Sequence, residues 1–263
     1  MTVPRIATTT PIGPVHAPLL VVGCSLGTSA LLWHKSAEIL SSDFRVSTWE
    51  LPGHGASPAT REGFSVADLA DAVAASYTEK FAYAGVSLGG AVGLELALRH
   101  PQRVSAVVTV CSAARFAEPQ AWHERAQTVR ASGTGAVVAQ SAQRWFAPDT
   151  MARFPDVAGR LLHALRDADD ESYALCCDAL AEFDMRGLLS TIAVPVTAAF
   201  GAHDAVTPEE ASREIADGVT NGRVIEIAGA SHLAPADSPE PTAVAVRNAL
   251  AGQGLEGMTH EHS

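Results

Sequence analysis

Residues 80–101 have the sequence KFAYAGVSLGGAVGLELALRHP, and this segment is the strongest indication of the fold class. Its first part, 80–87, is an apolar run typical of a buried strand in a parallel sheet. Its second part, 88–100, has the composition of a helix that ends before Pro101. Between them lies Gly85-Val86-Ser87-Leu88-Gly89, a G-x-S-x-G pattern. Ser87 is therefore predicted to occupy a tight strand-to-helix turn.

Such a turn suits a serine nucleophile. It lifts the Ser87 Oγ out of the sheet, and side chains at positions 85 and 89 would collide with it, which accounts for the two glycines. The helix N-terminus points at the same place, so the Leu88 N–H is a candidate donor to a developing oxyanion. The alternative is a serine that only caps a helix in a nucleotide-binding or other α/β fold.

Further apolar runs and helical patterns alternate along the chain, which predicts βαβ units and a mostly parallel central sheet flanked by helices. The other expected strands are 18–23, 44–51, 103–113, 194–201 and 223–229, and the other expected helices are 65–77, 208–218 and 239–250. From 115 to 185 strands are absent and helix formers dominate, so this segment is predicted to be a helical cap inserted between strands. The α/β core is then 1–114 and 186–252, with a disordered tail at 253–263.

Composition and charge restrict the function. The chain has 263 residues, 47% hydrophobic, and a formal net charge of -11. A surface this acidic argues against binding to nucleic acid or to an anionic membrane, because both require a basic footprint. It also means that an anionic substrate would need a local cation in its pocket.

The cysteines and the N-terminus favour a soluble cytoplasmic protein. Cys24, Cys111, Cys176 and Cys177 form no C-x-x-C pair, so neither a disulfide framework nor a zinc site is indicated. The first residues lack the apolar core of a secretion signal, and no run approaches the length of a membrane span.

Two residues are suitable partners for the serine. His232 follows the strand at 223–229 and precedes the last helix, where a general base would reach Ser87. Asp204 follows the strand at 194–201 and could fix the tautomer of His232 and stabilise its charged form. The order Ser87, Asp204, His232 is that of hydrolases with a nucleophile on such a turn. Asp237, beyond His232, is the rival carboxylate, and we interpret it as a surface or helix-start residue.

A second oxyanion donor is expected from the loop after the strand at 18–23. That loop has the sequence Gly23-Cys24-Ser25-Leu26-Gly27-Thr28. The Leu26 N–H is the candidate donor, and Ser25 is a candidate for substrate binding, with simple turn chemistry as its alternative.

Taken together, these motifs resemble those of the α/β-hydrolase superfamily, and most of all those of 3-oxoadipate enol-lactonases. LPGHGAS at 51–57 resembles the G-x-G-x-S loop of the superfamily. CSLGTSALLW at 24–33 resembles the S-L-G-T loop of the enol-lactonases. In the inserted segment, 173–186 resembles their Y-x-x-C-C-x-A…D-x-R segment, and 144–146 resembles their cap.

The resemblance implies hydrolysis of 3-oxoadipate enol-lactone, a step of the β-ketoadipate pathway of aromatic catabolism, through an acyl-enzyme on Ser87. No metal or cofactor is required. The partner is a small anionic lactone whose acetate arm needs a cation. Arg144, beside Trp145, is the candidate, since arginine can bind a carboxylate through two hydrogen bonds and tryptophan can wall a small pocket. The alternative for Arg144 is a surface arginine over a core tryptophan.

Other functions stay open at this stage, as does the oligomeric state. The same catalytic residues would serve a carboxylesterase or a hydrolase of carbon–carbon bonds in ring-cleavage products. A slow-turnover ligand sensor built on a hydrolase fold is the alternative from another class, because fold alone does not decide function.

Overall fold

The computed structural model describes residues 3–251, and its central element is a sheet with strand order β1-β3-β2-β4-β5-β6-β7. The strands are β1 (Ala7–Thr8), β2 (Leu19–Gly23), β3 (Arg45–Glu50), β4 (Phe81–Val86), β5 (Val104–Val110), β6 (Val196–Gly201) and β7 (Gly222–Ile227). Strand β1 pairs antiparallel with β3, and all other neighbouring strands are parallel. The predicted mostly parallel sheet is confirmed.

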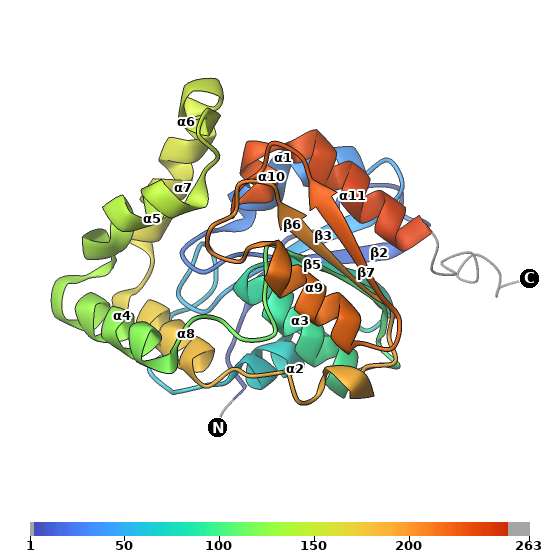
Figure 1. The fold of residues 1–263 in the computed structure, drawn as a ribbon, viewed down its shortest axis with the longest axis horizontal. Coiled ribbons are helices and arrows are strands. Elements are labelled where there is room, and N and C mark those ends of the chain that lie inside the picture. The colour runs from blue at the N-terminus through green and yellow to red at the C-terminus, as the bar shows by residue number, and fades with distance from the viewer. Residues whose placement is uncertain (1–2, 252–263) are drawn as a thin grey trace, which may run out of the picture.

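Helices cover both faces of this sheet (Figure 1). They are α1 (His34–Leu40), α2 (Val66–Ser76), α3 (Leu88–Arg99), α9 (Glu209–Gly218), α10 (Ala234–Asp237) and α11 (Pro239–Ala251). Helices α1 and α11 lie together on one face, and α2, α3 and α9 lie on the other. Because both faces are covered, β2, β4 and β6 are buried along their whole length, which explains their continuous apolar sequences.

Five helices follow one another between β5 and β6, and we call them the cap helices. They are α4 (Pro119–Ser132), α5 (Val138–Trp145), α6 (Thr150–Arg153), α7 (Pro155–Asp167) and α8 (Asp170–Ala181). Figure 1 shows them beside the sheet rather than stacked on either of its faces. Short 3₁₀ turns lie at Ala30–Trp33, Thr134–Val137 and Leu189–Thr191.

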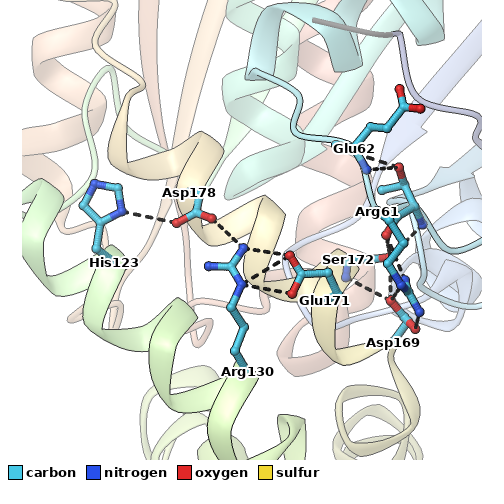
Figure 2. Close-up of polar contacts among 9 residues, drawn as sticks. Arg61, Glu62, His123, Arg130, Asp169, Glu171, Ser172 and Asp178 are labelled. Atoms are coloured by element: carbon cyan, nitrogen blue, oxygen red, sulfur yellow. Dashed lines mark hydrogen bonds and ion pairs between the residues drawn. The ribbon is translucent and has the colours of Figure 1, made fainter.

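Polar contacts tie helix α8 to its surroundings (Figure 2). Asp169 caps its N-terminus by accepting from the Ser172 N–H at 2.9 Å. The same carboxylate accepts two hydrogen bonds from Arg61, at 2.7 and 2.9 Å, in the loop that follows β3. On the other side, Arg130 of α4 pairs with Glu171 and Asp178 of α8. These contacts join the cap helices to each other and to the sheet domain.

Some elements were not predicted from the sequence. Strand β1 has only two residues at the sheet edge, and α1 is a short helix with the mixed sequence HKSAEIL, so neither has a strong periodic pattern. The tail expected at 253–263 lies outside the described residues. Among the described residues, no helix has the length and apolar character needed to cross a membrane.

Candidate active site

Ser87 occupies a strained turn between β4 and α3. Its φ of 56° and ψ of -117° lie in a region that a residue with a side chain rarely adopts. The Ser87 N–H donates to the Val110 carbonyl of β5 at 3.0 Å, which holds the turn against the neighbouring strand. A Cβ at residue 85 would collide with the Gly89 carbonyl, and a Cβ at residue 89 would lie 2.7 Å from the Gly23 carbonyl oxygen. The two glycines of the motif therefore allow a close approach of backbone segments.

Asp204 and His232 are in direct contact. His232 Nδ1 lies 3.0 Å from Asp204 Oδ2, and both side chains are buried. Asp204 also accepts hydrogen bonds from the Val206 N–H, at 2.7 Å, and from the Thr207 N–H and hydroxyl, at 3.2 and 2.7 Å. Burial opposes ionisation of Asp204, but the charge of His232 and these hydrogen bonds outweigh it and lower the pKa of the carboxyl. The ionised carboxylate then holds the proton of His232 on Nδ1 and leaves Nε2 as the basic nitrogen.

The loop that carries His232 is bonded to the cap directly through Leu233 and indirectly, through Asp237 of α10, at Ser231. The Leu233 N–H donates to the Trp145 carbonyl at 2.9 Å, and the Ser231 N–H donates to Asp237 at 2.7 Å. Asp237 also accepts from the Thr150 hydroxyl at 2.6 Å and from the N–H of residue 147 at 3.2 Å. Cap and imidazole are thus positioned by one shared set of hydrogen bonds.

The interpretation of Asp237 as a surface residue is wrong, whereas its place in the short helix α10, just before α11, agrees with a helix-start position. Asp237 is fully buried at the end of α10. The physical reason is the group of donors around it: three hydrogen bonds offset part of the cost of removing the carboxyl from water, and burial still raises the pKa of Asp237.

The loop after β2 places Ser25 and Leu26 close to the serine turn. The Thr28 N–H and hydroxyl both donate to the Ser25 carbonyl, at 3.1 and 2.7 Å. The Gly27 N–H donates to Nε2 of the buried His54 at 3.1 Å. The loop is therefore fixed on both sides of Leu26.

One pocket of about 400 Å³ collects most of the predicted site residues. Four of the predicted residues from the sheet domain line it, namely Ser25, Leu26, Ser87 and His232. The rest of the lining is Val206 and residues of the cap segment: Phe116, Ala117, Ala121, Trp122, Glu124, Arg125, Thr128, Ala136, Val137, Gln140, Ser141, Arg144, Trp145 and Tyr173. Asp204 lies behind His232, outside the lining. Leu88 is also outside it and fully buried, but as the first residue of α3 its N–H has no acceptor within the helix.

Within residues 3–251 the base has a hydrogen bond to the carboxylate but none to the serine. Among the described residues, the hydrogen bonds of His232 go to Asp204 and Thr207, and none joins it to Ser87 Oγ. In hydrolases without substrate this bond is often long and tightens when the substrate is in place.

Several pocket residues were missed from the sequence. Arg125 and Tyr173 face each other across α4 and α8, with Arg125 Nε 2.9 Å from the Tyr173 hydroxyl. The Tyr173 ring also stacks on His54, with centroids 5.9 Å apart. The LPGHGAS match pointed to the loop that contains His54, whereas no sequence signal marked Arg125. Within residues 3–251 no three His, Cys, Asp or Glu side chains are grouped to hold a metal ion.

Comparisons with known proteins identify the family of this fold. Residues 17–239 match a family model described as alpha/beta hydrolase fold. The chain is 32% identical to 3-oxoadipate enol-lactonase 2 of Acinetobacter baylyi, over 87% of this chain and 86% of the relative. It is 33% identical to a pimeloyl-[acyl-carrier protein] methyl ester esterase of Chromobacterium violaceum, over 82% and 88%. The crystal structure of the enol-lactonase from Burkholderia xenovorans LB400 superposes with a TM-score of 0.88 and 30% identity, covering 94% of this chain and 96% of that one.

Proposed function

Because this chain belongs to the alpha/beta hydrolase fold family, we propose that it hydrolyses carboxylic esters and that its substrate is the enol-lactone of 3-oxoadipate. The observation that carries the proposal is the convergence of Ser87 and His232 on one pocket, with Asp204 bonded behind the imidazole. The similarity to enol-lactonases from Acinetobacter baylyi and Burkholderia xenovorans supports the choice of substrate. A cytoplasmic location belongs to the same proposal, and the four buried free cysteines are compatible with a reducing compartment.

The reaction begins at the serine. His232 Nε2 takes the proton of Ser87, whose Oγ attacks the lactone carbonyl to give a tetrahedral oxyanion. The N–H groups of Leu26 and Leu88 stabilise that oxyanion, and removal of one such donor costs about 3 kcal/mol of activation free energy. Collapse of the intermediate breaks the ring C–O bond and expels an enolate.

The second half of the reaction regenerates the enzyme. The enolate takes the proton that His232 removed from Ser87 and becomes a ketone, while the acyl group stays on Ser87 as an ester and His232 is again a base. Water then attacks this ester, His232 removes a proton from that water, and 3-oxoadipate leaves. An enolate is a better leaving group than an ordinary alkoxide, so the first half needs less help from His232 acting as an acid.

Ester hydrolysis with a different acyl group is the second candidate. The pimeloyl methyl ester esterases match 74–84% of this chain at 28–33% identity, against 87% at 32% for the two enol-lactonases. For this chain, a methyl ester of a dicarboxylic acid is thus the natural competitor of the lactone.

The test is hydrolysis of the purified enol-lactone, followed by its ultraviolet absorbance, beside hydrolysis of a methyl ester of pimelic acid. The wild-type chain should have the higher kcat/KM for the lactone, and Ser87→Ala should reduce it roughly 10⁴-fold or more. A higher kcat/KM for the methyl ester would favour the esterase. Lactone turnover that survives Ser87→Ala would contradict the proposed mechanism.

A further inference from the structure

Two arginines supply the positive charge of the pocket. Of the side chains that line it within the described chain, Arg125 and Arg144 are the arginines and Glu124 is the carboxylate. The protein as a whole carries a net charge of -11, so an anionic substrate depends on these two groups for local attraction. The two differ in how they are held.

Arg125 is half-buried and fixed by neutral partners. Its Nε donates to the Tyr173 hydroxyl at 2.9 Å, and its two terminal nitrogens donate to Gln140 Oε1 at 3.0 Å and to Ser141 Oγ at 2.9 Å. Its guanidinium carbon lies 5.7 Å from the centroid of the Tyr173 ring. All three partners line the pocket, so the guanidinium is held in place at the pocket wall.

No carboxylate neutralises this charge. Among residues 3–251, Arg125 forms no ion pair, whereas Arg130, on the same helix, is paired with Glu171 and Asp178 away from the pocket (Figure 2). A guanidinium has five N–H donors, and the three bonds above leave one on each terminal nitrogen. Two donors on different terminal nitrogens of one arginine can each contact one oxygen of a carboxylate.

The Tyr173 hydroxyl adds another donor. It accepts from Arg125, and within the described chain no acceptor is present for its own hydrogen. Burial raises the pKa of Tyr173, so the phenol keeps that hydrogen throughout the neutral range. A buried hydroxyl without an acceptor is costly unless a ligand supplies one.

Arg144 is held differently. It is exposed at the end of α5, and in the described part of the chain its guanidinium makes no hydrogen bond or ion pair. A free side chain loses rotamer entropy when it binds, and water screens its charge. Arg144 is thus suited to attract an anion toward the mouth of the pocket rather than to fix its orientation.

We propose that Arg125, together with the Tyr173 hydroxyl, binds the free carboxylate of the substrate and makes the site selective for esters and lactones that carry a second, ionised carboxyl group. The inference rests on the proposed hydrolase function and deepens it by naming the group that recognises the acetate arm. Arg125 is then the residue that determines specificity between anionic and neutral substrates.

The test compares an anionic and a neutral probe with the same carbon chain, monomethyl glutarate and dimethyl glutarate. Binding is measured on the Ser87→Ala protein, which leaves both esters intact, through the fluorescence of Trp122 and Trp145 in the pocket wall. The anion should bind more tightly than the diester. Adding Arg125→Gln should weaken binding of the anion about 10- to 100-fold, as expected for loss of charge-assisted hydrogen bonds, and leave the diester within about twofold. Arg125→Lys should retain part of the preference.

Arg130→Gln is the matched control on the same helix and outside the pocket, and it should change neither affinity. The proposal is overturned if the anion has no advantage over the diester, if Arg125→Gln weakens both probes equally, or if Arg144→Gln causes the larger loss of anion binding. Because neither probe is the lactone, the outcome is independent of the proposed substrate. Selective binding that depends on Arg125 without lactone turnover would refute the enol-lactonase proposal alone. Lactone turnover with an unchanged KM in Arg125→Gln would refute the role of Arg125 alone.

Discussion

Acidification should weaken the loop that carries the Leu26 N–H, because this loop depends on a neutral histidine. His54 is 1% exposed. Its Nδ1 lies 2.9 Å from the Pro52 carbonyl, and its Nε2 lies 3.1 Å from the Gly27 amide nitrogen. A carbonyl only accepts and an amide N–H only donates, so the ring carries its proton on Nδ1 and accepts at Nε2. A second proton on Nε2 would face the Gly27 N–H and break this bond.

The magnitude follows from the pKa of the ring. Burial lowers the pKa of His54 from 6.5 to about 4, and the Pro52 carbonyl and the charge of Asp169 offset only part of that effect. Between these two values the unfolded chain binds a proton that the folded chain does not, so stability present above 6.5 is lost as the pH falls toward 4. One pKa unit corresponds to about 1.4 kcal/mol, which gives about 2.5 kcal/mol between about pH 7 and about pH 4.5.

The assay is urea unfolding of the wild type and of His54→Gln, followed by tryptophan fluorescence at both pH values. Other titrating groups contribute to both proteins and cancel in the comparison. The variant should lose about 2.5 kcal/mol less stability on acidification than the wild type. His163→Gln, which removes an exposed histidine of α7, is the control. Equal losses in the wild type and His54→Gln would refute the assigned protonation state and the coupling to the loop.

Two further variants test the scaffold of the site. Asp237→Ala leaves three donors without their acceptor, so it should reduce the free energy of unfolding by about 3 kcal/mol or more and also lower kcat. Asp217→Ala, the control at an exposed carboxylate of α9, should change neither quantity. An equal effect of the two substitutions would be evidence against the shared set of hydrogen bonds. Gly85→Ala places a Cβ against the Gly89 carbonyl and should lower the thermal unfolding midpoint by roughly ten degrees or more, the effect of a severe core defect in a chain of this size. Gly159→Ala, the control with open space around it in α7, should be neutral or slightly stabilising. A Gly85→Ala protein as stable as Gly159→Ala would contradict the close approach of residues 85 and 89.

The sequence predicted the elements whose signals are local. The two glycines around Ser87 are required by backbone contacts within and beside the turn, so a short motif contained that information. Asp204 and His232 were placed by their positions after strands, because the carboxyl ends of parallel strands meet at one edge of the sheet. The helix expected at 65–77 is α2, and Ser65 is its N-cap, with a capping box to Asp68.

Residues whose roles depend on tertiary contacts were missed or misjudged. Asp237 resembles a helix-start residue in sequence, and only the donors at Ser231 and in the cap make it a buried acceptor. Arg125 is one of several arginines on polar helical segments, and its partners Gln140 and Tyr173 come from two other helices. No local sequence pattern predicts these contacts of Arg125, because helix propensity does not depend on which face of the helix lies toward the pocket.

The residues of the site thus come from two parts of the chain. Ser87 and His232 come from loops at the edge of the sheet, whereas Arg125 and Tyr173 come from the cap helices. Hydrogen bonds from the loop of His232 to Trp145 and Asp237 join these parts into one unit. Under the proposed function, we expect substitutions on the pocket face of the cap to change the acyl group that is accepted and to leave Ser87 and His232 in place. Relatives of both kinds, lactonases and esterases, match most of this chain, so the charge of the pocket wall is the property to measure.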